Sequence, residues 1–196
     1  NCYLLFDDLS REAYVIDPSF DTTETIAFVR KNQLSVKAIL VTHAHFDHIA
    51  GISDFQNAFE ARIEIGLSPA DKPLYAQSGC AANYQIDLGQ LPPVSLSFTQ
   101  GQQLPLGKDV IEVRAVPGHT PGHVLFYVPS LNAAFCGDLI FKQGVGRTDH
   151  PGGDFDTLLA SIKTQVLTLP GNTTLYPGHG PSTTVADELE NNPFLK

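Results

Sequence analysis

Apolar residues fall into short runs along the chain, and the spacing within each run predicts its structure. Residues 13–18 (AYVIDP) and 36–42 (VKAILVT) are short, apolar and rich in β-branched side chains, which is typical of buried strands. Residues 109–117 (DVIEVRAVP) alternate between apolar and polar positions, which predicts a strand with one exposed face. Further strands are expected at residues 62–65, 123–129, 133–138 and 173–177.

Apolar residues three or four positions apart predict helices between these strands. Asp21 or Thr22 is expected to cap a helix whose inner face carries Ile26 and Val29. A second helical pattern covers residues 49–59, a short helix is possible at 69–77, and the rest of 66–107 is predicted to be loop. A helix capped by Asp154 should turn these residues inward: Phe155, Leu158, Leu159, Ile162 and Val166. A last helix is expected at 183–192.

Strands and helices therefore alternate through two comparable halves that meet near residue 95. No Gly/Ser linker or low-complexity tract separates the halves, so residues 1–196 are predicted to form a single domain. Sheet layers flanked by helices are the expected architecture, which places the chain in the α+β class. The phenylalanines Phe28, Phe55, Phe98 and Phe126 are predicted core residues, and Cys136 a buried small hydrophobe.

Composition narrows the possible partners. The formal net charge is −9, because 12 Lys and Arg stand against 21 Asp and Glu, and this acidity disfavours binding to nucleic acid. No apolar run approaches the about 18 residues that a membrane span needs. The three cysteines, Cys2, Cys80 and Cys136, are odd in number and widely spaced, which indicates reduced thiols in a cytoplasmic protein. A small molecule is the expected partner.

Side chains that bind metals are concentrated in one stretch and three turns. Residues 42–51 (THAHFDHIAG) hold four of them within six positions: His43, His45, Asp47 and His48. Three further candidates each lie in a glycine-containing turn after a predicted strand, where functional groups are commonly placed: His119, Asp138 and His179.

These seven candidates are five imidazoles and two carboxylates, with no thiolate among them. Structural zinc sites are usually rich in cysteine, so this set indicates a catalytic site. Seven ligands are too many for one tetrahedral ion but suit two divalent ions that share a carboxylate. Zinc is the first expectation, and iron or manganese would also accept these ligands.

The motifs THAHFDH, HTPGH, GD, GVGRTD and YPGHGP, in this order, resemble the metallo-β-lactamase superfamily, and in particular its glyoxalase II-like hydrolases. The resemblance covers nearly the whole chain and implies a four-layer αββα sandwich. It also implies that one ion is held by His43, His45 and His119, the other by Asp47, His48 and His179. Asp138 would bridge the two ions, and Asp47 and Asp138 would be the catalytic carboxylates.

The resemblance implies hydrolysis of a thioester or a related activated ester. No residue in the motifs is an obvious acid for a leaving group, and a thiolate, with a pKa of about 8.5, leaves without one. The helical C-terminal domain that binds glutathione in classical glyoxalase II is expected to be lacking here. Cysteine replaces Asp138 in the best-known metallo-β-lactamases, which disfavours antibiotic hydrolysis.

Other functions remain open at this level. Persulfide dioxygenases share the metal ligands but use one iron, and a lactonase or a metal-binding module without catalysis are further alternatives. Lys142 and Arg147 follow Asp138 and could bind an anionic part of the substrate. Arg147 could equally form a structural ion pair with Asp149 or Asp17. Asp17 could orient a ligand histidine or close a turn.

Overall fold

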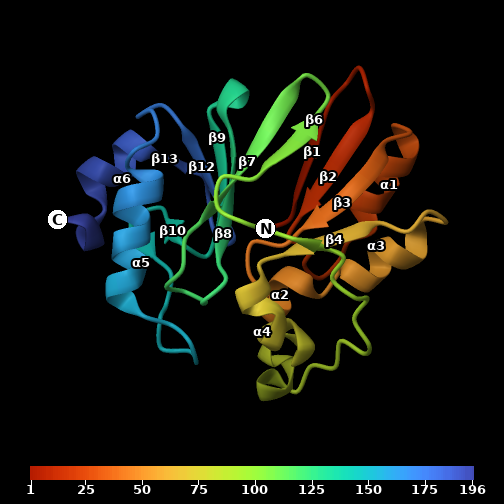
Figure 1. Ribbon diagram of the computed structural model, residues 1–196, viewed down its shortest axis with the longest axis horizontal. Coiled ribbons are helices and arrows are strands. Elements are labelled where there is room, and N and C mark those ends of the chain that lie inside the picture. The colour runs from red at the N-terminus through yellow and green to blue at the C-terminus, as the bar shows by residue number, and fades with distance from the viewer. The chain divides into compact units, whose positions relative to one another are not determined.

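The computed structural model describes residues 1–196 and divides into two compact units (Figure 1). Unit 1 comprises Asn1–Phe98 and Leu106–Lys108, and unit 2 comprises Thr99–Pro105 and Asp109–Lys196. The predicted division into two halves near residue 95 is therefore confirmed. No helix has the length and apolar composition that crossing a membrane requires.

Unit 1 is built on a five-stranded sheet in the order β1-β2-β3-β4-β5. β1 is antiparallel to β2, and β2, β3, β4 and β5 run parallel to one another. The strand bounds are β1 Tyr3–Phe6, β2 Glu12–Ile16, β3 Ser35–Leu40, β4 Glu64–Leu67 and β5 Leu96–Ser97. Parallel strands need long crossovers, and the helices of unit 1 occupy them.

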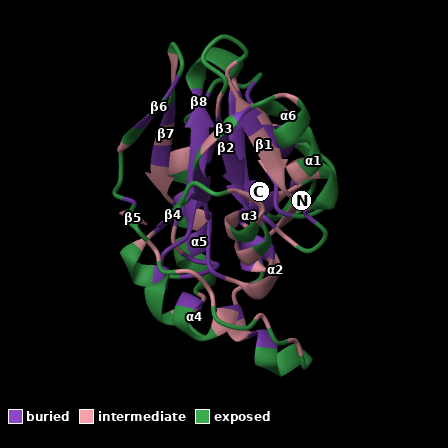
Figure 2. Cartoon of the chain, turned by 90° about the vertical axis from the view of Figure 1, so that its right-hand side faces the viewer, coloured by how far each residue is buried: buried purple, intermediate pink, exposed green.

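The helices of unit 1 are short. They are α1 Thr23–Lys31, α2 Phe46–Ile49, α3 Ile52–Ala58, η1 Pro69–Asp71, α4 Lys72–Ala76 and η2 Ser78–Tyr84. Ile49, Ile52 and Phe55 from α2 and α3 are fully buried in one cluster with Ile39 of β3. In Figure 2 most of β2 and the C-terminal half of β3 are buried, whereas much of α1 is exposed. The apolar pattern at 49–59 thus does face the core.

Unit 2 is built on a six-stranded sheet in the order β13-β12-β9-β8-β7-β6. β7, β8 and β9 are successively antiparallel, and β12 is parallel to β9. The bounds are β6 Gln103–Leu106, β7 Asp109–Ala115, β8 Val124–Val128, β9 Ala133–Gly137, β12 Thr174–Pro177 and β13 Thr183–Thr184. A separate hairpin pairs β10 Ile140–Phe141 with β11 Gly144–Val145.

Two main helices, α5 Phe155–Ser161 and α6 Val185–Asn191, belong to unit 2. The Asp154 carboxylate accepts the Thr157 N–H at 2.7 Å, which confirms the predicted cap of α5. The helix continues as a π-helical turn, η4 Ile162–Val166, and short 3₁₀ turns are found at η3 Pro129–Leu131 and η5 Pro193–Leu195. Leu158, Ile162 and Val166 are buried in the core cluster of this unit.

Four expectations need correction. Phe28 and Phe155 are each 42% exposed, so neither is a core residue as predicted. The helix expected at 49–59 is two helices, α2 and α3, and the break includes Gly51, whose N–H donates to the Pro18 carbonyl at 2.9 Å. Residues 66–107 contain more regular structure than expected, namely η2, β5 and β6, because tertiary pairing formed elements that the local pattern does not show.

Candidate metal centre

The four candidate ligands of unit 1 lie beyond the carboxyl end of β3. Because β2 and β3 are parallel, with Ile16 opposite Leu40, Asp17 after β2 lies beside the segment that follows β3. Functional groups of open α/β sheets gather at such an edge. The topology therefore brings Asp17 to the THAHFDH segment, although 25 residues separate Asp17 from Thr42.

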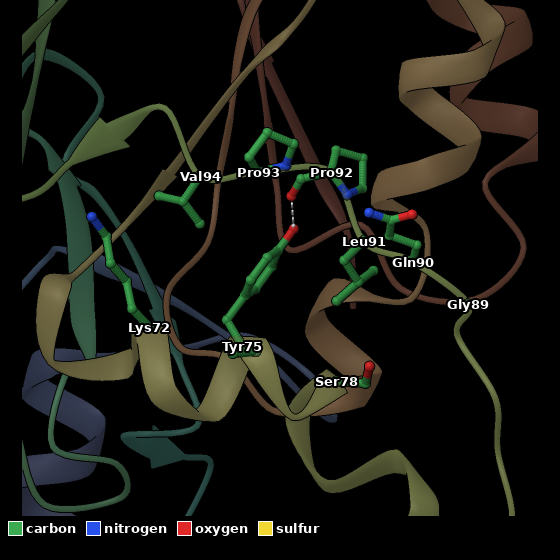
Figure 3. Close-up of a pocket in the computed structure, with 10 residues that line it drawn as sticks. Lys72, Tyr75, Ser78, Gly89, Gln90, Leu91, Pro92, Pro93 and Val94 are labelled. Atoms are coloured by element: carbon green, nitrogen blue, oxygen red, sulfur yellow. Dashed lines mark hydrogen bonds between the residues drawn. The ribbon is translucent and has the colours of Figure 1, made fainter.

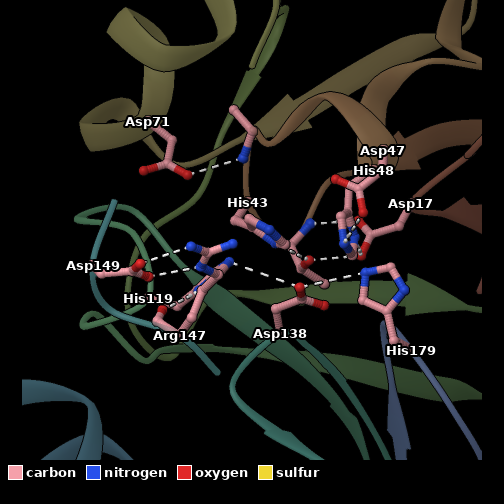
Figure 4. A network of polar contacts seen from close by, with 12 residues as sticks. Asp17, His43, Asp47, His48, Asp71, His119, Asp138, Arg147, Asp149 and His179 are labelled. Atoms are coloured by element: carbon pink, nitrogen blue, oxygen red, sulfur yellow. Dashed lines mark hydrogen bonds and ion pairs between the residues drawn. The ribbon is translucent and has the colours of Figure 1, made fainter. Parts of the chain in front are cut away.

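Asp17 is buried and binds the ligand segment through three hydrogen bonds (Figure 4). Its carboxylate accepts the Thr42 N–H at 2.7 Å, the Thr42 hydroxyl at 2.6 Å and Nδ1 of His48 at 2.9 Å. Since a carboxylate only accepts, Nδ1 of His48 carries the proton, and the lone pair of this imidazole is at Nε2. A carboxylate behind an imidazole is a common arrangement at metal sites, because it fixes the tautomer and raises the basicity of the ligand.

His43 is oriented by the same carboxylate through Thr42. The Thr42 hydroxyl donates its proton to Asp17, so its oxygen accepts from Nδ1 of His43 at 3.1 Å. The lone pair of His43 is then at Nε2 as well. Asp17 thus sets the tautomers of two buried imidazoles, and the interpretation that it orients a ligand histidine is favoured over a simple turn.

The ligand atoms of this segment are close together. One nitrogen of His43 and one of His45 lie within 4.8 Å of each other. Nε2 of His48 lies 3.8 Å from Oδ2 of Asp47. Two ligands of one tetrahedral ion, with bonds of about 2.1 Å, stand about 3.4 Å apart. The spacing of the Asp47 and His48 atoms therefore suits a shared ion.

Two residues outside the motif hold its backbone. Asp71 follows β4 at the same edge of the sheet and accepts the Ala44 N–H at 3.0 Å from a buried carboxylate. Gly79 has a φ of +62° and packs so closely that a Cβ there would overlap the backbone of Ala44 and Phe46. The sequence analysis did not single out either residue, although Asp71 shares the placement of the candidate ligands after a strand.

Unit 2 brings three candidate ligands to one edge of its sheet. β7, β9 and β12 run in the same direction, so the segments after them share an edge, and they carry His119, Asp138 and His179. Oδ2 of Asp138 lies 3.8 Å from Nε2 of His119 and 3.5 Å from Nε2 of His179. Asp138 is thus within ligand spacing of both imidazoles (Figure 4).

A backbone carbonyl orients His119. Nδ1 of His119 donates to the carbonyl oxygen of Arg147 at 2.7 Å. The lone pair of this imidazole is therefore at Nε2, on the side of Asp138. The chain approaches closely here because Gly146 has no side chain, and a Cβ would overlap the Asp138 carbonyl. The GVGRTD motif therefore contributes backbone geometry in addition to its charged side chains.

The guanidinium of Arg147 pairs with Asp149 through two hydrogen bonds of 2.7 Å. This pair holds the pKa of Asp149 well below its ordinary value, and both side chains are exposed. The ion pair expected between these residues is confirmed. Binding of an anionic substrate group by Arg147, or by the exposed Lys142, stays a prediction.

Unit 1 also holds a cavity of about 400 Å³ between α4 and residues 89–94 (Figure 3). None of the residues that line it is a candidate ligand. The Tyr75 hydroxyl points into it and donates to the Pro92 carbonyl at 2.8 Å, and burial raises the pKa of Tyr75. This hydroxyl stays protonated near neutral pH, so it offers no base for chemistry.

The donors of each unit fit divalent metal ions. All are nitrogen or carboxylate oxygen, and the imidazoles of His43, His48 and His119 are held in the tautomer that presents Nε2. Cys136, which lies near Asp138 in sequence, is fully buried, and burial raises the pKa of its thiol to about 12. A thiolate ligand from Cys136 is therefore disfavoured, and its expected role as a buried hydrophobe is confirmed.

Comparison with known proteins identifies the family. The sequence-family model of the metallo-beta-lactamase superfamily matches residues 1–179. The chain therefore belongs to this superfamily of metal-binding, hydrolase-like enzymes. The crystal structure of the BLEG-1 B3 metallo-beta-lactamase has a TM-score of 0.91 at 36% identity, covering 100% of this chain and 93% of that one. The fold class predicted from the sequence is thereby confirmed.

Relatives with two different activities share the same percentage identity with this chain. The hydroxyacylglutathione hydrolase GloC of Haemophilus influenzae is 34% identical over 201 residues, which cover 100% of this chain and 92% of that protein. The mitochondrial persulfide dioxygenase ETHE1 of Bos taurus is 34% identical over 199 residues, 98% of this chain and 70% of that protein. The structure of TTHA1623 in a di-iron-bound form has a TM-score of 0.88 at 38% identity, covering 100% of this chain and 94% of that one.

Proposed function

We propose that the protein is a dinuclear metal-dependent hydrolase of thioesters or related activated esters, of the glyoxalase II type. In this proposal the seven candidate ligands would hold two divalent ions. As the resemblance implies, one ion would be held by His43, His45 and His119, the second by Asp47, His48 and His179, and Asp138 would be a ligand of both. The observation that carries the proposal is the donor set: five imidazoles and two carboxylates, with three of the imidazoles held in the tautomer that has its lone pair at Nε2.

When bound, divalent ions at such a site lower the pKa of water toward about 7 and polarise a substrate carbonyl. The chain supplies the rest. Asp17 holds His43 and His48 in one tautomer, and the Arg147 carbonyl does the same for His119. Asp47 and Asp138 would supply the negative charge that offsets the ions.

The relationship to a hydroxyacylglutathione hydrolase supports a thioester as substrate. A thiolate leaves without help from an acid, which suits a site whose histidines are committed to metal ions. The three cysteines are free thiols, and this supports the proposed cytoplasmic location, because thiols stay reduced there. Zinc is the proposed metal, with iron the alternative that the di-iron form of a relative supports.

Two other activities have a specific observation in their favour. The identity to a persulfide dioxygenase supports a mononuclear iron oxidoreductase as second candidate. The similarity to a structure described as a B3 metallo-beta-lactamase supports an assay with β-lactams, although cysteine replaces Asp138 in the best-known lactamases. Lactones complete the panel of activated esters.

The deciding experiment measures metal content per chain, by elemental mass spectrometry, on protein purified without added metal. About two zinc ions, together with hydrolysis of S-lactoylglutathione or simpler thioesters, would support the proposal. About one iron ion and persulfide-dependent oxygen uptake would replace it with the second candidate. Two bound ions without turnover of thioesters, lactones, β-lactams or persulfides would leave a metal-binding module and overturn the enzyme.

A further inference from the structure

Three aromatic side chains form a row on the surface of unit 1. The ring of Phe46 lies 4.8 Å from the ring of Tyr84 and 6.2 Å from the ring of Phe20, between ring centroids. Phe20 and Tyr84 are each 51% exposed, and Phe46 is partly exposed. The three residues come from separate parts of unit 1: the segment before α1, the first turn of α2 and the end of η2.

One residue of the aromatic row, Phe46, is adjacent in sequence to two candidate metal ligands. Phe46 stands between His45 and Asp47 in the chain, so its ring projects from the backbone that positions both. The segment of Tyr84 is fitted to that backbone, because Gly79 packs against the amide of Phe46. Ser78, Gly79 and Cys80 all have positive φ values, of 52°, 62° and 65°. A non-glycine residue in this left-handed conformation raises the free energy of the folded chain, so such a run indicates a segment that its surroundings hold in place.

Exposed aromatic rings in contact with one another indicate a binding surface. Each ring that stays in water forgoes the free energy of burial, and contiguous apolar patches on a protein surface commonly mark sites that bind a ligand. Aromatic faces suit flat or aliphatic groups, which gain dispersion contacts and exclude water.

The charged residues around the aromatic row indicate which of these substrate groups it would bind. The segments that carry it, residues 17–22, 43–49 and 78–87, contain no Lys or Arg, and two of their aspartates, Asp21 and Asp87, are exposed. An anionic carrier such as a glutathione or nucleotide thiol would find no Lys or Arg on these segments to pair with its charges. A neutral apolar group needs no such partner.

We infer that Phe20, Phe46 and Tyr84 form the subsite for the acyl group of the substrate, and that this group is apolar, with several carbons or an aromatic ring. The inference rests on the proposed hydrolase function and makes it more specific. It places the acyl chain on unit 1, beside His45 and Asp47, and it predicts that a small hydroxyacyl group such as lactoyl is used less well than a longer apolar one.

The test uses thioesters of N-acetylcysteamine, a small neutral thiol, with acetyl, butanoyl, hexanoyl and benzoyl groups, and metal-loaded protein. For the wild type, kcat/KM should rise about threefold to fourfold for each methylene that the row buries. Tyr84→Ala and Phe46→Leu should flatten this dependence. Phe28→Ala is the matched control, because Phe28 is an exposed aromatic residue of α1 in the same unit and should keep the full dependence.

A second measurement does not depend on turnover. Saturation-transfer NMR on metal-free protein should show contacts of the hexanoyl thioester with aromatic protons, and these should weaken in Tyr84→Ala but persist in Phe28→Ala. Hydrolysis that is indifferent to acyl length, with no aromatic contacts, would overturn the acyl subsite while leaving the hydrolase intact. A protein that hydrolyses no thioester of the series but still binds the hexanoyl group would overturn the hydrolase and leave an apolar binding surface.

Discussion

The two units assemble their candidate ligands in different ways. Unit 1 takes four from one continuous segment, His43 to His48, whereas unit 2 takes three from the ends of three strands. A continuous segment fixes the order and approximate spacing of its ligands covalently. In unit 2 the ligands meet only when β7, β9 and β12 are in register, so the sheet itself must form before the donors come together.

The orienting groups differ as well. Unit 1 uses a buried, charged side chain, Asp17, for both His43 and His48. Unit 2 uses a neutral backbone carbonyl, that of Arg147, for His119. A single substitution can remove the Asp17 carboxylate, whereas no side-chain substitution removes the Arg147 carbonyl. The histidines of unit 1 should therefore be sensitive to mutations outside the ligand set, and His119 should be resistant to them.

Asp138→Ala should have the largest effect, because it removes a carboxylate that lies within ligand spacing of both His119 and His179. We expect loss of at least one bound ion and a fall in kcat/KM beyond the about 10–100-fold that loss of an orienting partner causes. Metal content and thioester turnover measure the two effects. Asp156→Ala, at an exposed position of α5, is the control; retention of both ions with full activity would remove Asp138 from the site.

Asp17→Asn tests the sensitivity of unit 1. The amide is similar in size but loses the charge and cannot accept every hydrogen bond that the carboxylate accepts from Thr42 and His48. Metal affinity should fall about 10–100-fold, measured by competition with a chelator. Asp54→Asn, whose carboxylate accepts from Thr22 in the same unit, should leave affinity unchanged. An unchanged affinity in Asp17→Asn would show that the imidazoles of unit 1 need no charged partner.

A pair of glycine substitutions measures how tightly the segment of unit 1 is held. Gly79 and Gly89 have nearly equal φ values, +62° and +63°, but a Cβ at Gly79 would meet the backbone of the ligand segment, and one at Gly89 would meet nothing within 4 Å. Gly79→Ala should lower the free energy of unfolding by about 1–3 kcal/mol more than Gly89→Ala. Urea denaturation with unchanged m-values measures the difference, and equal losses in the two variants would mean that only backbone strain matters.

The candidate ligands and the two halves of the chain could be predicted because both follow from local sequence patterns. Four candidates were marked by one dense stretch of ligand-type residues, and the other three by glycine turns after apolar strands. The two halves followed from the alternation of strands and helices. Val29 and Leu158 are buried as their helical spacing predicted. Phe155 has the same spacing signal, and Phe28 was predicted to be a core residue as an aromatic side chain, yet both lie exposed.

The support of the site could not be predicted, because it depends on residues distant in sequence. Asp71 reaches Ala44 only once β4 is parallel to β3, and Gly79 reaches Phe46 only through the turn at 78–80. The Arg147 carbonyl reaches His119 across 28 residues. A sequence motif identifies side chains that are needed at a site. A contact made by a backbone carbonyl, or a close approach that requires glycine, is much harder to predict from a single sequence.

Arg147→Ala should have the smallest structural effect and the most specific functional one. The carbonyl that orients His119 remains in this variant, so metal content should not change. The ion pair with Asp149 is exposed, and exposed pairs contribute little to stability, so the melting temperature should also stay the same. The pKa of Asp149, held low chiefly by its hydrogen bonds from Arg147, should rise toward its ordinary value of about 3.9.

If Arg147 also binds an anionic group of the substrate, KM for a charged thioester such as S-lactoylglutathione should rise about tenfold, the loss expected for one charge-assisted hydrogen bond. KM for a neutral N-acetylcysteamine thioester should not change, which makes the pair of substrates its own control. Because Asp149 stays ionised from pH 5 to pH 8, the ratio of the two KM values should be flat over that range. Equal KM values in wild type and variant would assign the side chain of Arg147 to its ion pair alone, and the contribution of this residue to the site would then be its backbone.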